Sequence, residues 1–226
     1  MEYNSRMLEL RESKGVEGVI SLLSKKIGNE IKSGKQVLWL IGGGSSIDIA
    51  AAARRGLPSD ALNKLEVSLT DERFGPRSHS NSNWQALIDA GFEIRGLQAT
   101  EIIKDQDLAA ETLDFDRFLK AALEKCDFTI GLIGIGADSH IAGIKPGSLA
   151  VKSHELAIGY RADDFERITM TFEAIKKLDL CVAYLKEKDK KQVIQSFKYE
   201  YPLDSRPSQI LKQVKKAIIF VDTNGG

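Results

Sequence analysis

The amino-acid sequence predicts an α/β protein with a doubly wound, mostly parallel sheet and helices on both faces. Short apolar runs alternate with longer amphipathic stretches along the 226 residues, which is the rhythm of strands joined by crossover helices. Several runs are nearly continuous in Val, Ile and Leu, as expected of parallel strands that are buried on both faces. No internal repeat or low-complexity linker interrupts this pattern, so we expect a single domain over residues 1–226.

Each apolar run predicts one strand, and each amphipathic interval predicts one helix. The strands are expected at Val37–Ile41, Glu66–Thr70, Phe128–Ile133, Arg167–Thr171, Leu180–Leu185 and Ala217–Val221. The helices are expected at Met7–Lys32, Ser46–Arg55, Asn81–Ala90, Ala109–Lys125, Lys188–Tyr199 and Ser208–Gln213. Glycine and proline cluster between these elements, where turns belong. The order of elements predicts a modified Rossmann-like sheet, in which ligands bind beyond the carboxyl ends of the strands.

Composition narrows the classes of function. Lysine plus arginine and aspartate plus glutamate number 32 each, so the chain lacks the basic excess of a nucleic-acid-binding protein. No segment approaches the roughly 18 apolar residues that span a bilayer, and Met1–Gly15 has no apolar run of a signal peptide. Cys126 and Cys181 lie apart in apolar settings, which favours buried, reduced thiols. We therefore expect a cytoplasmic protein that binds neither nucleic acid nor a membrane.

The first junction of interest follows the strand at Val37–Ile41 and is rich in glycine. Gly43 and Gly44 allow the backbone to approach a ligand closely, and Ser45 and Ser46 can help to hold an anion where the next helix begins. The loop lacks the Gly-Lys-Ser/Thr ending of a nucleotide P-loop, which argues against ATP or GTP. The alternative is a tight turn in which one of the two serines caps the helix.

The second junction places Asp71, Glu72 and Arg73 at the end of a strand, with His79 and Asn83 further along. Most charge runs are solvated turns. This one lies at the sheet edge where ligands bind, which favours a role in binding. His79 is expected in a solvated loop.

The third junction, Gly131–Ser148, holds Asp138 and His140 in a glycine-rich turn. It begins like the Gly-x-Gly-x-x-Gly fingerprint of dinucleotide-binding proteins, but Ser139 occupies the position of the third glycine. No further strand that ends in an acidic residue follows at the right distance. These departures exclude NAD. An imidazole exchanges protons near neutral pH, and a nearby carboxylate orients it and favours its charged form. A lone histidine is more often structural, but its place at the ligand-binding edge favours catalysis by His140.

In this order and at these separations, the three junctions resemble the family that contains 6-phosphogluconolactonase and glucosamine-6-phosphate deaminase. The family pattern has a Gly-Gly-Ser-Thr loop, an Asp-Glu-Arg strand end with a later Ser-Asn, and a Gly-x-Gly-x-Asp-Gly-His turn. Arg167–Thr171 resembles the lactonase strand Arg-Ile-Thr-Leu-Thr, Lys190 stands where the family places a phosphate-binding lysine, and Pro207–Asp222 resembles the lactonase C-terminus. The resemblance covers about Val37–Asp222.

Two positions favour the lactonases over the deaminases. Lys145 stands five residues after His140, where the deaminases carry a glutamate that works with the histidine in ring opening. Lysine cannot replace that acid in proton transfer without a large pKa shift. The segment Asp71-Glu72-Arg73 has the lactonase form, whereas the deaminases have Asp-Glu-Tyr. The resemblance thus implies hydrolysis of 6-phosphoglucono-δ-lactone to 6-phosphogluconate. A deaminase and a catalytically silent sugar-phosphate-binding protein are the alternatives.

The same resemblance implies roles for individual residues. His140 is the base that activates water, and Asp138 orients its ring. The lactone is an activated ester and no cluster of metal ligands is visible in the sequence, so we expect no cofactor and no metal. The expected partner is a small phosphosugar, and the oligomeric state is left open. The expected substrate-binding residues are Gly43, Gly44, Ser45, Ser46, Asp71, Arg73, Asn83, Arg167 and Lys190.

Three residues depart from the family pattern and bear on activity. Ile47 stands where proline is frequent, and Glu187 stands where glycine usually begins the segment that leads to Lys190. Ser139 replaces the glycine between Asp138 and His140. A serine at that position is strained if the backbone there needs a positive φ.

Overall fold

The structure, a computed structural model, describes residues 7–224, so residues 1–6 and 225–226 of the predicted domain lie outside it. Its centre is a seven-stranded sheet with the strand order β1-β10-β9-β6-β2-β3-β5. Every neighbouring pair in this sheet is parallel. The strands are β1 (Leu8–Ser13), β2 (Val37–Ile41), β3 (Leu65–Leu69), β5 (Gln98–Ala99), β6 (Phe128–Leu132), β9 (Leu180–Lys186) and β10 (Ala217–Asp222).

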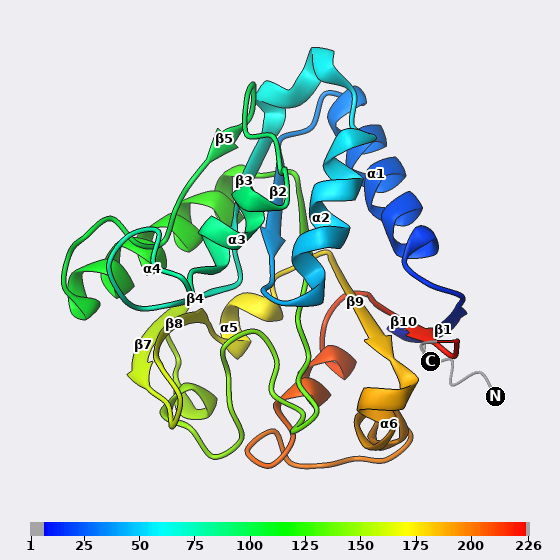
Figure 1. The fold of residues 1–226 in the computed structure, drawn as a ribbon, viewed down its shortest axis with the longest axis vertical. Coiled ribbons are helices and arrows are strands. Elements are labelled where there is room, and N and C mark those ends of the chain that lie inside the picture. Colours follow the sequence, from blue (N-terminus) through cyan, green and yellow to red (C-terminus); the bar gives the residue numbers. More distant parts are fainter. Residues whose placement is uncertain (1–6, 225–226) are drawn as a thin grey trace.

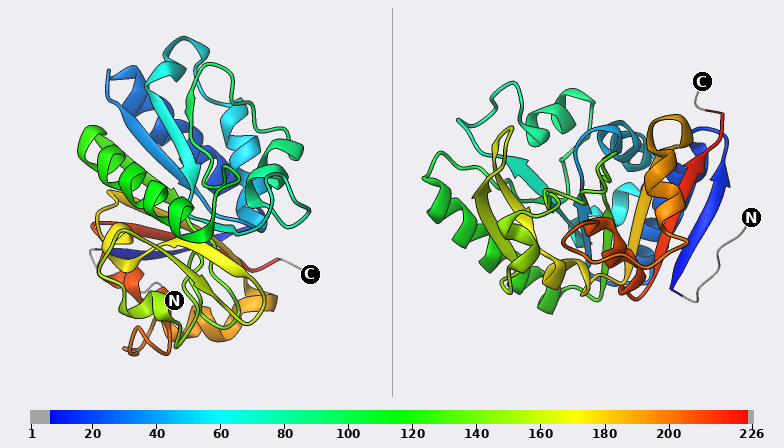
Figure 2. Two further views of the ribbon diagram at one scale, coloured as in Figure 1. Left: turned by 90° about the vertical axis from the view of Figure 1, so that its left-hand side faces the viewer. Right: turned by 90° about the horizontal axis from the view of Figure 1, so that it is seen from below.

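Helices cover both faces of this sheet (Figures 1 and 2). Helices α1 (Glu17–Lys32) and α2 (Ser45–Arg55) lie side by side on one face, and α4 (Leu108–Lys125) lies on the other. Right-handed crossovers require this division, because the chain runs outward from β2 to β3 and β5 and then returns to β6. The predicted doubly wound α/β fold is confirmed. The remaining helices are α3 (Asn83–Asp89), α5 (Phe172–Ile175), α6 (Glu187–Ser196) and the 3-10 helices η1 (Ser59–Lys64), η2 (Leu149–Lys152) and η3 (Pro207–Lys212).

A second, three-stranded antiparallel sheet lies beyond the carboxyl end of β3 (Figure 1). It contains β4 (Asp71–Arg73), β8 (Glu166–Met170) and β7 (Ala157–Arg161), in that order. The strand predicted at Arg167–Thr171 exists as β8, but its expected place in the parallel sheet was wrong. The loop between β7 and β8 is short, and a short loop can join only antiparallel strands, because parallel pairing needs a long crossover.

The helix predicted at Met7–Lys32 was wrong in its first part. Its N-terminal third is the edge strand β1, which pairs in parallel with β10, and α1 begins only at Glu17. The segment Leu8–Arg11 alternates leucine with charged residues, a period of two that is typical of a half-buried strand. A similar correction applies to Ser208–Gln213, because the structure has the 3-10 helix η3 there.

The apolar core fills the space between the sheet and its helices. All five residues of β2 are buried, in keeping with a central strand covered on both faces. Helix α1 buries Val19, Leu23, Ile27 and Ile31, each at most 1% exposed, at spacings that keep one face towards the sheet. Burial of such a side chain contributes about 1.5–3 kcal/mol. Among the described residues, no helix is long and apolar enough to cross a membrane.

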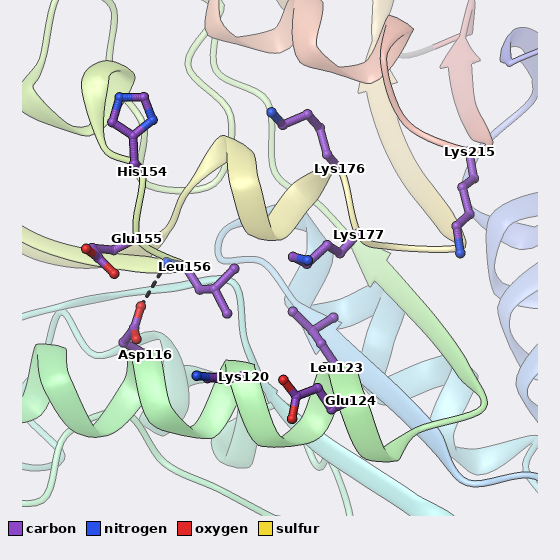
Figure 3. A pocket seen from close by; sticks show the side chains of 10 residues that line it. All are labelled: Asp116, Lys120, Leu123, Glu124, His154, Glu155, Leu156, Lys176, Lys177 and Lys215. Atoms are coloured by element: carbon purple, nitrogen blue, oxygen red, sulfur yellow. Dashed lines mark hydrogen bonds between the residues drawn. The ribbon is translucent and has the colours of Figure 1, made fainter.

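The small sheet is tied to the main body through helix α4. The carboxylate of Asp116 on α4 accepts a hydrogen bond from the backbone N–H of Leu156 at 2.8 Å (Figure 3). It also accepts the N–H of Ala157 at 3.0 Å, where β7 begins. Strand β7 pairs with β8, which pairs with β4. Asp116 therefore helps to fix the sheet that carries Arg73 and Arg167.

We expect Asp116→Ala to lower the free energy of unfolding by about 1–3 kcal/mol, because it leaves two backbone donors without their acceptor. Asp116→Asn is the matched control, since its amide oxygen can still accept both bonds, and it should retain most of the stability. Urea denaturation of both variants measures the difference. Equal stability of the alanine variant and the native chain would refute this role.

Candidate active site

The site lies beyond the neighbouring strands β2 and β6, where the order of strands in the main sheet reverses. The next main-sheet strand after β2 is β3, on one side, and the next after β6 is β9, on the other; between β6 and β9 the chain also forms β7 and β8 of the small sheet. A reversal of this kind opens a crevice at the carboxyl ends of the two strands. The loops meet at their bases, where Gly42 N donates to Leu132 O at 2.7 Å. The first and third predicted junctions are thus adjacent.

Asp138 and His140 form a close pair in the turn after β6. Nδ1 of His140 lies 2.6 Å from Oδ1 of Asp138, and the same oxygen accepts the backbone N–H of His140 at 3.1 Å. The hydrogen bond from His140 holds the pKa of Asp138 well below its usual range, and the charges of His140 and Lys145 act in the same direction. A carboxylate on Nδ1 leaves Nε2 as the free basic nitrogen. The His140 side chain is 32% exposed, so a substrate can reach it.

Gly136 makes this pair possible. A Cβ atom at Gly136 would overlap the His140 ring and approach Asp138 Oδ1 within contact distance. The turn is closed by a hydrogen bond from Gly136 N to His140 O at 2.9 Å. Glycine is therefore required here for the close approach of the ring to the backbone.

Ser139 adopts the left-handed backbone that its family counterpart glycine would favour. Its φ is +70°, the residue is 1% exposed, and its hydroxyl has no hydrogen-bond partner among the described residues. Its carbonyl accepts a hydrogen bond from Ser208 N at 2.9 Å, which joins the turn to η3. Serine at 139 is thus strained, and it also buries an unpaired hydroxyl.

Asp71 and Asn83 lie close to the glycine loop and to the third junction. Nδ2 of Asn83 donates to the backbone carbonyl of Asp71 at 3.0 Å, and Oδ1 of Asn83 is buried without a partner among the described residues. A Cβ atom at Gly43 would collide with this amide, so the glycine loop and Asn83 are in close contact. Thr169, which faces Asp71 across β4 and β8, accepts the N–H of Gly143 at 2.9 Å. Asp71 and Asn83 therefore lie between the first and third junctions.

Glu72 is a structural residue to which the sequence analysis gave no role. Its buried carboxylate accepts the backbone N–H groups of Asn83 (2.7 Å) and Trp84 (2.9 Å) and the hydroxyl of Ser82 (2.9 Å). Burial raises the pKa of Glu72, and these hydrogen bonds oppose that shift. The acid stabilises the start of α3 and so fixes Asn83. Its signal in the sequence is an acidic residue ten positions before the cap Ser82.

The two predicted arginines face each other across β4 and β8. Arg73 and Arg167 occupy directly opposite positions in the antiparallel register. Arg167 is 7% exposed, and its Nη2 donates to Oδ2 of Asp164 at 2.6 Å. Arg73 donates to the carbonyl of Asn81 at 2.9 Å. Both guanidinium groups lie on the side of the small sheet that also carries Asp71 and Thr169, which pair with each other two positions along.

His79 is structural, as expected of a loop histidine. Its Nδ1 accepts the backbone N–H of Asn81 at 3.2 Å, and its Nε2 lies 2.9 Å from the carbonyl of Arg73. Both ring nitrogens are thus engaged by the loop itself.

Lys190 reaches the third junction from helix α6. Its Nζ donates to the carbonyl of Ile135, which lies in the turn that leads to Asp138. Burial lowers the pKa of Lys190, while Asp189 and Asp138 raise it. The backbone at Lys190 is non-helical (φ −133°, ψ 23°), and Glu187 begins the helix. The structure thus brings the predicted lysine to the turn that leads to Asp138 and His140.

The start of α2 offers uncapped backbone donors. Gly44 is the N-cap residue, and no side chain accepts a hydrogen bond at this cap. The predicted alternative, in which Ser45 or Ser46 caps the helix, is therefore wrong; both serines lie inside the first turn. Ile47 is buried in the same turn. The N–H of Ile47 donates to the carbonyl of Gly44 at 3.1 Å. The N-terminus of this 11-residue helix carries a partial positive charge that favours an anion.

No group of three or more histidine, cysteine, aspartate or glutamate side chains among residues 7–224 is arranged to hold a metal ion. Cys126 and Cys181 are both free thiols, half-buried and buried respectively, and burial raises the pKa of Cys126 to about 11.

Comparison with known proteins identifies the family to which this chain belongs. The sequence model of the glucosamine-6-phosphate isomerases/6-phosphogluconolactonase family matches residues 12–220. The chain is 25% identical over 181 residues to the 6-phosphogluconolactonase of Mycobacterium leprae, which is 70% of this chain and 73% of that protein. It is 28% identical over 137 residues to "Probable 6-phosphogluconolactonase 4, chloroplastic" of Oryza sativa subsp. indica, covering 53% of this chain and 42% of the rice protein. The match therefore spans less than half the length of the rice protein.

The fold is also similar to that of a solved structure. The crystal structure of 6-phosphogluconolactonase from Thermotoga maritima superimposes with a TM-score of 0.80 over 95% of this chain and 98% of that one, at 19% identity. This likeness concerns the fold, including the main parallel sheet and the small antiparallel sheet.

We expect Ser139→Gly to raise the free energy of unfolding by about 1–2 kcal/mol. Glycine relieves about 1–2 kcal/mol of left-handed strain and removes a buried unpaired hydroxyl, at a cost of about 0.5–1 kcal/mol in chain entropy. Urea denaturation measures the change. Ser78→Gly is the matched control, because Ser78 has a φ of +60° but an exposed side chain, and it should change stability less. An equal or smaller gain at 139 than at 78 would contradict the account of Ser139.

Proposed function

Because the chain belongs to the glucosamine-6-phosphate isomerase/6-phosphogluconolactonase family, we propose that it hydrolyses 6-phosphoglucono-δ-lactone to 6-phosphogluconate. One observation carries the proposal. A histidine with a free basic nitrogen and a carboxylate on its other nitrogen stands at the sheet's switch point, next to a set of basic side chains. This arrangement suits general-base hydrolysis of a phosphorylated ester.

Asp138 prepares His140 for proton transfer. The ionised carboxylate holds the proton of the neutral imidazole on Nδ1, so that Nε2 accepts a proton from water. The water oxygen bonds to the lactone carbonyl carbon, and the bond from that carbon to the ring oxygen then breaks. The ring oxygen takes up the proton from the imidazolium, which restores the neutral ring. Asp138 stabilises the imidazolium while it exists. Base assistance of this kind contributes a factor of about 10²–10⁴ in rate.

Basic groups on three sides would hold the phosphate. Arg167 and Arg73 come from the small sheet, Lys190 comes from α6, and the uncapped N–H groups come from the start of α2. Arginine offers a planar fork and lysine a point charge, and both suit a phosphate dianion. Gly43, Gly44, Ser45 and Ser46 are proposed ligand contacts in the α2 loop. Asp71 and the unpartnered amide oxygen of Asn83 are proposed to bind sugar hydroxyls.

Lys145 favours the lactonase over the deaminase. Its Nζ lies 3.3 Å from Asp164, so this position offers a paired cation in place of the acid that ring opening requires. We therefore expect no release of ammonia from glucosamine 6-phosphate. A catalytically silent protein would bind 6-phosphogluconate, which thermal stabilisation detects, without turning over either substrate.

The direct test is loss of freshly generated 6-phosphogluconolactone. The native chain should accelerate its loss above the spontaneous rate, and His140→Ala should lower kcat by about 10²–10⁴-fold, because the base is gone. Ser139→Gly should raise kcat if strain at 139 displaces His140. Absence of any acceleration by the native chain would refute the proposed function, and ammonia release from glucosamine 6-phosphate would favour the deaminase.

We expect Asp138 to add no ionisation to the pH profile of kcat/KM between about pH 4 and 8. Asp138 remains ionised there, because its partners hold its pKa well below the ordinary value of about 3.9. Its contribution to stability is likewise present above about pH 4 and is lost only as the pH falls towards the lowered pKa. Initial rates between about pH 4 and 8 measure the slope. A slope of two on the acid side would contradict this assignment.

A further inference from the structure

The small sheet places two like charges against each other. Arg73 and Arg167 lie directly opposite in β4 and β8, and like charges in that position destabilise a sheet. The ring of Phe165 lies close to both, with guanidinium carbons 5.7 and 5.6 Å from its centroid. Cation–π attraction offsets part of the repulsion. The arrangement nevertheless concentrates positive charge beside the proposed active site.

Asp164 forms ion pairs with two of the cations in this region, Arg167 and Lys145. Oδ2 of Asp164 lies 2.6 Å from Nη2 of Arg167 and 3.3 Å from Nζ of Lys145, which extends from the catalytic turn. No other carboxylate within residues 7–224 forms an ion pair with Arg73, Arg167 or Lys145. Three cations and one carboxylate leave two positive charges uncompensated. A phosphate monoester carries a charge of about −1.5 to −2 near pH 7, which matches that excess.

The arginines also have unused hydrogen-bond donors. The Nε atoms of Arg73 and Arg167 are both buried, and neither has an acceptor among the described residues. Buried donors of this kind are rare in folded proteins, and a guanidinium group pairs best with an oxyanion that accepts two bonds at once. Asp164 therefore satisfies the cluster only in part.

Within residues 7–224, the hydrogen bonds and ion pairs of the Asp164 side chain come only from its own loop and these two cations. Its side chain is 40% exposed, and its second oxygen accepts only the N–H of the next residue, Phe165, at 3.0 Å. The loop Ala162–Phe165 is closed by one backbone hydrogen bond of 2.9 Å from Ala162 N to Phe165 O. The carboxylate can therefore withdraw without breaking a contact to the rest of the body other than the ion pairs. Those pairs hold the pKa of Asp164 well below its usual range.

We propose that Asp164 is an internal anion that occupies the cations Arg167 and Lys145 in the ligand-free protein and gives way to the substrate's phosphate. The inference rests on the proposed function, because it assumes that a sugar phosphate binds on this face. Asp164 touches no reacting atom, and it sets the affinity for phosphorylated ligands. A ligand that binds only the form with Asp164 withdrawn has its apparent affinity reduced by the fraction of molecules in that form.

The test is Asp164→Asn, which keeps the shape of the side chain and removes its charge. We expect the Kd for 6-phosphogluconate, measured by titration calorimetry, to fall about two- to fivefold, the range of an exposed ion pair. The KM for the phosphorylated lactone should fall by the same factor with kcat unchanged. The KM for glucono-δ-lactone, which has no phosphate, should not change. Asp164→Ala should act in the same direction, and Asp164→Glu should restore the native Kd.

Asp163→Asn is the matched control. Asp163 is exposed on the same loop and forms no ion pair within the described part of the chain, so this variant changes the net charge equally. Its Kd for 6-phosphogluconate should equal that of the native chain. An equal gain in both variants would indicate a general charge effect and overturn the inference.

The remaining outcomes separate the inference from the proposed function. If the native chain binds 6-phosphogluconate and Asp164→Asn binds it equally or more weakly, Asp164 is no competitor. The inference then fails, and the proposed function stands. If the native chain does not accelerate loss of the phosphorylated lactone and does not bind 6-phosphogluconate, both fail.

Discussion

The site depends on one constraint of topology: the order of strands in the main sheet reverses between the neighbours β2 and β6, whose next main-sheet strands are β3 and β9 on opposite sides. Such a reversal leaves backbone N–H groups and side chains exposed at one point on the sheet edge. Every proposed functional group reaches that point from a different element. Asp138 and His140 follow β6, the glycine loop follows β2, the arginines lie on the small sheet, and Lys190 comes from α6. The positions of these groups relative to one another are therefore set by the sheet and its crossovers.

The site has two further requirements. Side chains must approach the backbone closely, and positive charge must be in excess. Gly136 lets the His140 ring fold back onto its own turn, and Gly43 admits the Asn83 amide. The cations are under-compensated in the ligand-free molecule, since Asp164 alone pairs with Arg167 and Lys145 among the described residues. A site with surplus positive charge and unused buried donors is stabilised when an oxyanion enters. The same positive charge destabilises the small sheet, because Arg73 and Arg167 lie opposite each other and like charges repel.

Much of this arrangement could be predicted from the sequence, because β2, β6, β9 and β10 are largely apolar runs and two of the polar junctions follow β2 and β6 directly. Asp138, His140, Asp71, Asn83, Gly43 and Lys190 are brought to the crevice as the order of elements implies. The strand β1 was missed because its alternating charges were absorbed into a helical pattern. The small sheet was missed because antiparallel pairing of β8 depends on a hairpin partner that has no strong apolar signal.

Other features depend on tertiary contacts and leave no local signal. The pairing of Asp164 with Lys145 joins residues from two loops, and the capture of the α3 N-terminus by Glu72 joins a strand to a helix across the intervening loop. Ser139 could be identified from the sequence, because the family pattern has glycine at that position. Its positive φ is known only from the structure. The cytoplasmic location and the single domain over residues 1–226 stay predictions.

The central claim is that His140 faces the lactone carbonyl while the basic cluster holds the phosphate. A crystal structure of the native chain with 6-phosphogluconate tests it most directly. The account predicts the product carboxylate about 3 Å from Nε2 of His140 and the phosphate against Arg167, with Asp164 displaced. A phosphate bound at His140, or a ligand bound away from the ends of β2 and β6, would contradict it.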